Sequence, residues 1–436
     1  MKILIKNGVV LLNHGKNIIF EKNDILINGK TIEKVAKNII EEVDHLIDAT
    51  DQVVMPGFIN MHTHLPMKML QGVAEGMNLE SWLSDVIWPL ESKMTDKDVE
   101  LATKMTILEL LDCGTTCFND MYEHQEGILK ATKDMGVRGV ICKTFFGSSM
   151  SDDDIENTLE FLKKHQGNEL IDVSIAVHQL CDISRSNMNK VLDKFRGKSK
   201  YLHIHLAESK FTYNKVKENY GMTPAEAILS FDTDGYNVLA AHCVQFSKED
   251  VELFKDKNIF PIHNPISNAK LASGIAPIED FIKASVPVSI ATDGSASNNK
   301  LNMLEELKFG ALMQKLRYND PLAGNATDYI KMLTVNPSIA LGKNDVLGSI
   351  AEGKLADIVT FPLDEFSVLP NLNMLNNLLY SGSGLKTRNV IINGRIIKRD
   401  NTYIYFSEKA IINNFNNMVN NFYKNQNIVE IANYKE

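Results

Sequence analysis

Cysteine is scarce in this chain of 436 residues. The five cysteines are scattered, odd in number and never arranged as Cys-x-x-Cys. Such a set predicts neither a disulfide framework nor a zinc ribbon, and it is typical of reduced, mostly buried thiols. No apolar run approaches the about 18 residues that a transmembrane helix needs, and the N-terminus lacks the cleavage pattern of a signal peptide. We therefore expect a cytoplasmic protein that does not bind membranes.

An excess of positive charge is also absent. The chain has 46 Lys and Arg residues against 55 Asp and Glu residues, which gives a formal net charge of −9. This balance argues against a protein that binds nucleic acid or an anionic membrane surface. The hydrophobic share of 44% is ordinary for a globular protein, and the length allows one large domain and one small one.

A Gly-x-Gly-x-x-Gly motif after a strand is missing as well, which argues against a dinucleotide site in an open, doubly wound sheet. The middle of the chain instead alternates predicted strands with predicted helices, as in a parallel sheet. Eight strands in about 240 residues are typical of an α/β fold, the (β/α)8 TIM barrel. The predicted strands are Val53–His62, Thr115–Met121, Arg138–Phe146, Val173–His178, Tyr201–Leu206, Asn237–His242, Ile259–His263 and Pro287–Asp293.

Short strand patterns separated by turn signals occur near both ends of the chain. They are Lys2–Lys6, Val9–Leu12, Asp24–Ile27, Thr31–Val35, Lys354–Phe361 and Thr387–Lys398. Neither end has enough chain for a stable sheet by itself, so we expect one small composite β-sandwich domain from residues 1–56 and 346–405. The barrel then covers residues 57–345. An apolar stripe at helical spacing predicts a C-terminal helix in residues 406–436 that packs on the barrel.

Two histidines end the apolar stretch that begins at Pro56-Gly57. His62 and His64 are separated by one residue, and side chains at i and i+2 of a strand point to the same side. They can therefore direct two imidazole nitrogens at one metal ion. A lone His-x-His motif is weak evidence, but other polar residues also end predicted strands, where barrels build their active sites. These residues are Asp120, His178, His205, His242, His263 and Asp293.

The remaining metal ligands are predicted from strands five and eight. His205 lies nearer the end of strand five than His203, which we expect to be a core histidine. Asp293 ends an apolar strand, where a carboxylate is costly unless it is paired or coordinated; it is a fourth ligand or binds the metal's water. Three histidines and one aspartate suit Zn²⁺. Predicted strand four contains no lysine to bridge a second ion, so we expect one zinc ion per chain.

Two further residues suit proton transfer beside that ion. Glu208 follows His205 by three residues and can take a proton from a metal-activated water. His242 can hydrogen-bond the attacking hydroxide, although a satisfied buried histidine explains its position equally well. Together these groups are the parts of a hydrolase that acts on a planar carbon.

These residues together resemble the signature of the amidohydrolase superfamily. Four motifs stand in the expected order: Pro56–His64, His203–Glu208, Ala241–Val244 and Thr292–Asn299. The chain looks closest to the 5-methylthioadenosine/S-adenosylhomocysteine deaminases, within the group that also holds the triazine chlorohydrolases. Further matches are Gly72–Gly76, Trp82-Leu83, Pro89–Glu91 and His263–Leu271. The resemblance covers nearly the whole chain.

The resemblance implies roles for individual residues. The positions that match His62, His64, His205 and Asp293 bind the metal, Glu208 handles protons, and His242 and Asp293 orient the attacking water. The position that matches Glu91 holds the ribose hydroxyls, and the one that matches His178 contacts the purine. From the sequence alone, Glu91 is equally a helix-surface acid. The resemblance also implies a homo-oligomer, a dimer or a tetramer.

The chain departs from the family where the amino-acid tail of S-adenosylhomocysteine is bound by arginines after strand three. Lys143 stands near one such position, and we predict that it binds substrate. The segment Met150–Asp154 is acidic where the other arginine would lie, and a carboxylate opposite a substrate carboxylate is unfavourable. S-adenosylhomocysteine is therefore expected to be the poorer substrate.

The predicted function is hydrolytic deamination of an adenine-type nucleoside such as 5-methylthioadenosine, S-adenosylhomocysteine or adenosine, with release of ammonia. One alternative is deamination or dechlorination of another heterocycle: guanine, a pterin, a cytosine-like base or a triazine. Another is a non-catalytic homologue that only binds a ligand, which would not need Glu208 and His242. A metal-free barrel isomerase does not explain the His-x-His motif together with Asp293.

Overall fold

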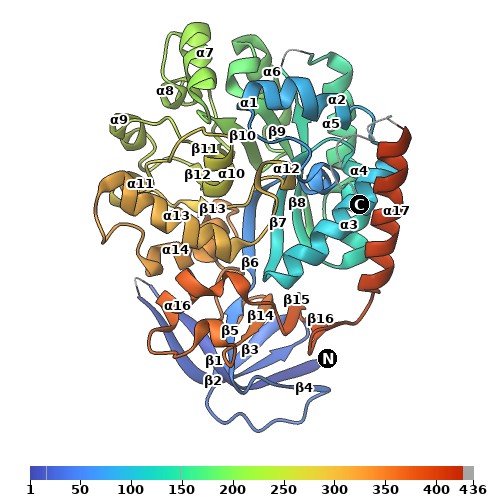
Figure 1. The fold of residues 1–436 in the computed structure, drawn as a ribbon, viewed down its shortest axis with the longest axis vertical. Coiled ribbons are helices and arrows are strands. Elements are labelled where there is room, and N and C mark those ends of the chain that lie inside the picture. The colour runs from blue at the N-terminus through green and yellow to red at the C-terminus, as the bar shows by residue number, and fades with distance from the viewer. Residues whose placement is uncertain (16, 148, 426–436) are drawn as a thin grey trace, which may run out of the picture.

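Eight parallel strands form the centre of the molecule, and their order in the sheet is their order in the chain. The structure is a computed structural model that describes residues 1–15, 17–147 and 149–425. Helices surround the strands to form a TIM barrel, and a second sheet lies below it (Figure 1). The barrel strands are β6 (Phe58–Thr63), β7 (Thr115–Tyr122), β8 (Arg138–Phe145), β9 (Ile171–Gln179), β10 (Tyr201–Leu206), β11 (Asn237–His242), β12 (Ile259–His263) and β13 (Ser289–Ile290).

Helices connect the strands and cover the outside of the barrel (Figure 1). They are α3 (Asp96–Asp112), α4 (Gln125–Met135), α5 (Asp152–His165), α6 (Arg185–Phe195), α7 (Lys210–Tyr220), α8 (Pro224–Leu229), α9 (Lys248–Glu252), α10 (Pro265–Lys270), α11 (Ile278–Lys283), α12 (Ser295–Asn298), α13 (Met303–Tyr318), α14 (Ala326–Leu333) and α15 (Val335–Ala340). Short helices α1 (Leu79–Ser81) and α2 (Trp88–Glu91) lie over the top of the barrel. Within the described ranges, no helix combines the length and apolar character needed to cross a bilayer.

Acidic residues at helix starts have a structural use. Ser151 accepts a hydrogen bond from the backbone N–H of Asp154, and the Asp154 carboxylate accepts one from the backbone N–H of Ser151, which is a capping box. Three aspartates, Asp152, Asp153 and Asp154, occupy the first turn of α5, where the helix dipole favours negative charge. The acidic segment noted in the sequence therefore begins a helix.

Both ends of the chain contribute to the second sheet, which is one continuous nine-stranded sheet. Strand β5 (Gln52–Pro56) pairs in parallel with β1 and antiparallel with β14, so the N-terminal and C-terminal strands meet there. The other strands are β1 (Lys2–His14), β2 (Asn17–Asn28), β3 (Thr31–Ala36), β4 (His45–Asp48), β14 (Ile358–Pro362), β15 (Asn389–Ile392), β16 (Arg395–Arg399) and β17 (Thr402–Tyr403). The exact limits of the two domains stay a prediction.

The first predicted barrel strand, Val53–His62, is wrong as a single element. Gly57 divides it into β5, which belongs to the lower sheet, and β6, which belongs to the barrel. A Cβ atom at Gly57 would lie 2.0 Å from the Thr116 hydroxyl oxygen, so this close passage requires glycine. The sequence signal was continuous because both halves are buried.

The last predicted strand, Pro287–Asp293, is also shorter in the structure. Only Ser289–Ile290 pairs regularly as β13, because the chain then turns away: Asp293 has a left-handed backbone with φ of 63°. Its N–H donates to the carbonyl oxygen of His62 at 3.0 Å. The Asn60 side chain bonds both the backbone N–H and the hydroxyl of Thr292. These contacts link the eighth strand segment to the first.

Two C-terminal helices complete the chain. Helix α16 (Met374–Ser381) lies against α13 and α14. Helix α17 (Glu408–Asn425) buries Phe415, Met418 and Phe422 and runs beside α3 of the barrel (Figure 1). The remainder of the predicted segment 406–436, residues 426–436, lies outside the described residues.

A buried ion pair joins the barrel to the lower sheet. The Arg138 guanidinium at the start of β8 donates to the Asp357 carboxylate from Nε at 2.8 Å and from Nη2 at 3.1 Å. Arg138 and Asp357 are 2% and 6% exposed. The carboxylate also accepts from the backbone N–H of Asn393 at 2.7 Å. A charged pair in this setting is costly to break, because the remaining charge stays buried.

We expect Arg138→Met to lower the free energy of unfolding by about 3–5 kcal/mol, since it leaves Asp357 buried without its cation. The shift of the urea unfolding midpoint measures this loss. Lys30→Met is the matched control, because the Lys30–Glu169 pair has side chains that are 58% and 57% exposed; it should cost less than about 1 kcal/mol. Equal shifts of the unfolding midpoint for the two variants would show that the buried Arg138–Asp357 pair does not stabilise the contact between the barrel and the lower sheet.

Candidate active site with a metal centre

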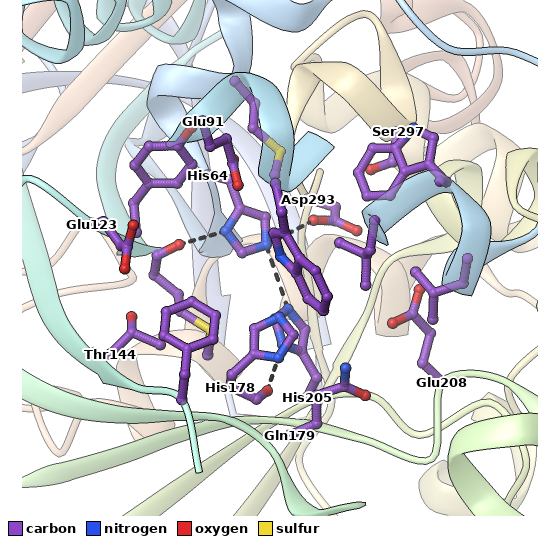
Figure 2. A pocket seen from close by; sticks show the side chains of 18 of the residues that line it. His64, Glu91, Glu123, Thr144, His178, Gln179, His205, Glu208, Asp293 and Ser297 are labelled. Atoms are coloured by element: carbon purple, nitrogen blue, oxygen red, sulfur yellow. Dashed lines mark hydrogen bonds and ion pairs between the residues drawn. The ribbon is translucent and has the colours of Figure 1, made fainter. Parts of the chain in front are cut away.

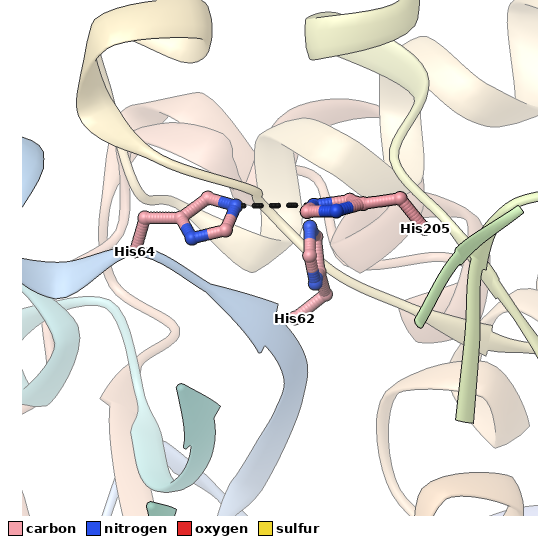
Figure 3. A group of neighbouring side chains, drawn as sticks. All are labelled: His62, His64 and His205. Carbon is pink, nitrogen blue, oxygen red and sulfur yellow. Dashed lines mark hydrogen bonds between the residues drawn. The ribbon is translucent and has the colours of Figure 1, made fainter. Parts of the chain in front are cut away.

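Three histidines from the ends of two barrel strands bring their ring nitrogens together. His62 is in β6, His64 directly follows the last residue of β6, and His205 is in β10. One nitrogen of each lies within 4.8 Å of the others, and Figure 3 shows the three rings facing a common point. Because the strands are parallel, their carboxyl ends meet at one end of the barrel. The His-x-His motif and the distant His205 therefore form one group.

Asp293 adds a carboxylate to this group. Its Oδ1 atom lies 3.4 Å from Nε2 of His62 and 3.2 Å from Nε2 of His64. The other oxygen, Oδ2, accepts a hydrogen bond from the hydroxyl of Ser267 at 2.6 Å. The backbone link between Asp293 and His62 holds the carboxylate at this place. Three imidazoles and one carboxylate are a donor set that suits a divalent metal such as zinc.

The hydrogen bonds of His64 and His205 leave their Nε2 atoms free for a metal. Nδ1 of His64 donates to the carbonyl oxygen of Met121, and Nδ1 of His205 donates to that of His178. A carbonyl can only accept, so the proton sits on Nδ1 and Nε2 keeps its lone pair. Nε2 of His62 is buried and has no hydrogen-bond partner. The residues present therefore fit a metal ion.

In the protein without a metal, the pKa values of His62 and His64 reflect their burial and the negative charge of Asp293. Burial lowers the pKa of His62 to about 3. Burial acts in the same direction on His64, but the hydrogen bond and the charge of Asp293 outweigh it and raise the pKa of His64 to about 9. One imidazolium thus balances Asp293 when no other cation is present. The same field favours a divalent cation.

His203 lies beneath the group and away from the cavity. It is fully buried, its Nε2 lies 2.8 Å from Nδ1 of His62, and its Nδ1 accepts from the side-chain amide of Asn119 at 3.0 Å. Asn119 also donates to the carbonyl oxygen of Met61. His203 is therefore a core histidine that orients the His62 ring.

Glu208 and His242 lie beside the metal group without belonging to the three-histidine set. Nε2 of His242 is 3.6 Å from Oε2 of Glu208 and 4.0 Å from Oδ2 of Asp293. Nδ1 of His242 bonds the Asn268 side-chain oxygen at 2.8 Å, which fixes the ring. Glu208 is 6% exposed, and burial raises its pKa to about 7 although the charge of His242 acts against this. A carboxyl group with such a pKa exchanges protons near neutral pH.

A cavity of about 360 Å³ opens above these residues (Figure 2). Its floor includes His64, His205, Glu208, His242 and Asp293. Its walls are largely apolar or aromatic, which is typical of small-molecule sites. The apolar residues are Met67, Leu79, Trp82, Leu83, Trp88, Met121, Phe146 and Leu271.

Glu91 and His178 both line this cavity, from different sides. Glu91 is in α2; its Oε1 is buried without a hydrogen-bond partner. Burial raises the pKa of Glu91 to about 7, and a hydrogen bond with Tyr122 acts against the rise. The ring of His178 stacks on Phe146 with centroids 4.9 Å apart. Glu91 is thus not a helix-surface acid, since its carboxylate faces the cavity.

Lys143 is the one predicted substrate-binding residue that does not line the cavity. It lines a neighbouring hollow of about 530 Å³, where its Nζ donates to the Gln125 side-chain oxygen at 3.2 Å. In β8, alternate side chains point to opposite sides, and the next residue, Thr144, is the one that faces the cavity. His263, another polar residue at a strand end, borders a separate hollow of about 160 Å³.

Sequence reasoning missed the residues that hold the site from outside. Ser267 bonds Asp293, and Asn268 bonds His242; both belong to α10. Buried Glu306 accepts from the backbone N–H of Ile266 at 3.2 Å and from the side chain of Asn298, so it secures α10 and α12. No signal inside the single sequence marks such partners, because they act only through the fold.

Comparisons with known proteins agree with the geometry. Residues 53–397 match the amidohydrolase family. The 5-methylthioadenosine/S-adenosylhomocysteine deaminase of Clostridium tetani is 34% identical over 430 residues, which cover 98% of this chain and 100% of the relative. The 5'-deoxyadenosine deaminase of Methanococcus maripaludis is 35% identical over 419 residues, covering 94% and 97%. A zinc-bound crystal structure of an adenosine deaminase from Xanthomonas campestris has a TM-score of 0.91 at 27% identity, covering 97% and 98%.

We expect Ser267→Ala to weaken metal binding by about 10-fold to 100-fold, because partners of a coordinating carboxylate tune its affinity by that amount. The dissociation constant for zinc, measured by competition with a chelator, gives the readout. Ser295→Ala is the matched control, since the buried Ser295 hydroxyl in neighbouring α12 has no hydrogen-bond partner. Unchanged affinity in Ser267→Ala would contradict a metal held by Asp293.

Proposed function

The chain belongs to the amidohydrolase family, and we propose that it hydrolytically deaminates adenine-type nucleosides, such as 5-methylthioadenosine, S-adenosylhomocysteine or adenosine, with release of ammonia. One observation carries this proposal: four metal-type donors converge on the cavity floor beside a buried carboxyl, Glu208, that is not among them. Pure ligand binding needs no such proton carrier. The names of the relatives support a nucleoside as the substrate.

In this proposal His62, His64, His205 and Asp293 hold one zinc ion. When bound, such an ion lowers the pKa of a water molecule towards about 7 and so supplies a nucleophile at neutral pH. Glu208 takes the proton of the attacking water and delivers it to the ring nitrogen beside the amino-bearing carbon. Glu208 then takes the remaining proton from the hydroxyl group added to the carbon and delivers it to the amino group, so that the C=O bond forms, the C–N bond breaks and ammonia leaves. Nε2 of His242 faces the oxygen that is added to the ring, and the bond of Nδ1 to Asn268 keeps Nε2 directed inward.

The cavity residues orient the nucleoside for this chemistry. We assign the carboxylate of Glu91 to the ribose hydroxyls, since a carboxylate can accept from both. The His178 ring contacts the purine, with Phe146 stacked behind it. The apolar walls exclude bulk water, which strengthens each of these polar contacts. Lys143 has no role in this assignment, because its side chain lies in the neighbouring hollow.

We further propose a cytoplasmic location, which the five buried free cysteines support. The homo-oligomer, a dimer or a tetramer, stays a prediction. It rests on the family resemblance alone, since a single chain is described.

Ammonia release from 5-methylthioadenosine and adenosine tests the function. Removal of the metal by a chelator should abolish release, and added zinc should restore it. Glu208→Gln should retain the metal but lose about 10²–10⁴-fold or more in kcat, because the proton carrier is gone. A metal-free protein that stays fully active would contradict the mechanism. Activity confined to guanine, a pterin, a cytosine-like base or a triazine would contradict the substrate assignment.

A variant and a modified substrate together test the role of Glu91. Glu91→Gln should lower kcat/KM for adenosine by about 10-fold or more, as expected for loss of a charged hydrogen bond. The same variant should change kcat/KM for 2′,3′-dideoxyadenosine little, because this substrate has no hydroxyls for Glu91 to hold. Equal losses of kcat/KM for both substrates would show that Glu91 does not act through the ribose hydroxyls.

A further inference from the structure

Two nucleosides in the name shared by several relatives differ only at the 5′ end. 5-Methylthioadenosine carries a small uncharged thioether, whereas S-adenosylhomocysteine carries an amino-acid tail with an ammonium and a carboxylate. We propose that this chain selects nucleosides with an uncharged, apolar 5′ substituent and discriminates against the zwitterionic tail. The inference rests on the proposed function and adds the chemical class of the 5′ group.

The charges around the cavity carry the first part of the inference. Four carboxylates line it, those of Glu91, Glu123, Glu208 and Asp293. Among the residues that the structure describes, no lysine or arginine side chain lines it, and its other ionisable groups are histidines and the phenol of Tyr122. A substrate carboxylate that enters this space loses its hydration and finds no lysine or arginine among the described lining residues to pair with, so its binding is unfavourable.

The lysines of nearby segments already have partners. Lys143 bonds Gln125 in the neighbouring hollow. Lys215 lies 3.4 Å from Oδ1 of Asp182, whose other oxygen is 3.7 Å from Nδ1 of His178. Lys270, which precedes the cavity residue Leu271, donates to the carbonyl oxygen of Ala296 at 3.3 Å and pairs with Glu75. Each would have to leave its partner before it could hold a tail carboxylate.

The neighbouring hollow does not provide a simple route to Lys143. It shares Glu123 and His124 with the cavity, so a tail directed towards Lys143 passes the carboxylate of Glu123. His124 is held by Asp96 at 2.7 Å. Among the described residues, the lysines that line this hollow are Lys143 and Lys164, and Lys164 pairs with Glu126. The passage is therefore acidic at the point where it would have to attract an anion.

The apolar surfaces carry the second part of the inference. Trp88 lines the cavity and is 40% exposed, so its ring offers apolar surface to a ligand. Its ring meets the edge of His178, which stacks on Phe146. Thr144, the β8 residue that faces the cavity (Figure 2), is uncharged, and its buried hydroxyl has no partner. A thioether or methyl group fits such walls, whereas the charged ammonium and carboxylate of the amino-acid tail do not.

Three substrates separate charge from size. We expect kcat/KM for 5-methylthioadenosine to exceed that for S-adenosylhomocysteine by at least 100-fold. 5′-Butylthioadenosine, an uncharged analogue of similar length, should stay within tenfold of 5-methylthioadenosine. A value for S-adenosylhomocysteine within tenfold of 5-methylthioadenosine would overturn the inference, as would an equally poor butylthio analogue, since length would then be limiting. If the protein deaminates none of the three substrates, the proposed function itself is contradicted.

A variant tests the missing cation directly. Ser149 lines the cavity and is exposed, so a longer side chain can be placed there. Ser149→Arg should raise the ratio of kcat/KM for S-adenosylhomocysteine to that for 5-methylthioadenosine at least tenfold. Ser149→Gln, of similar length but uncharged, is the matched control and should change the ratio by less than threefold. Equal changes in both variants would overturn the electrostatic explanation.

Discussion

The hydrogen bond from the backbone N–H of Asp293 to the carbonyl oxygen of His62 joins the last strand segment of the barrel to the first. It is also the contact that sets the geometry of the site, because both residues contribute donor atoms to the same point. Asp293 can turn back towards β6 only in its left-handed conformation. Closure of the barrel and assembly of the metal group are thus one structural event.

Burial gives the assembled groups their chemistry. Each imidazole of the three-histidine set has its outer nitrogen engaged, two with carbonyl oxygens and one with His203, so the rings cannot turn. Desolvation keeps His62 neutral and raises the pKa of Glu208. A carboxylate ligand and a proton-carrying carboxyl therefore lie near each other with different protonation behaviour, set by their neighbours. Asp293 faces His62 and His64, whereas Glu208 faces only His242.

The lower sheet anchors the start of this arrangement. Strand β5 is paired on both sides, and the chain passes from it through Gly57 directly into β6, which carries His62 and is followed at once by His64. The buried Arg138–Asp357 pair holds the base of β8 to the same sheet. The base of the barrel is thereby fixed, while helices α1 and α2 above it shape the cavity that receives the ligand.

The sequence by itself determined the barrel class and predicted the residues of the candidate metal site, because strand alternation and the position of polar residues at strand ends are local patterns. It also marked Glu208, His242 and His178, which line the cavity as predicted positions. It did not determine that Val53–His62 is two strands in two sheets, since both halves are equally apolar. Only the tertiary structure decided that Lys143 faces away from the cavity. Neighbouring residues of β8 point to opposite sides of the sheet, so a difference of one position along the strand decides which side chain faces the cavity. The supports Ser267, Asn268 and Glu306 likewise exist only as contacts between distant segments.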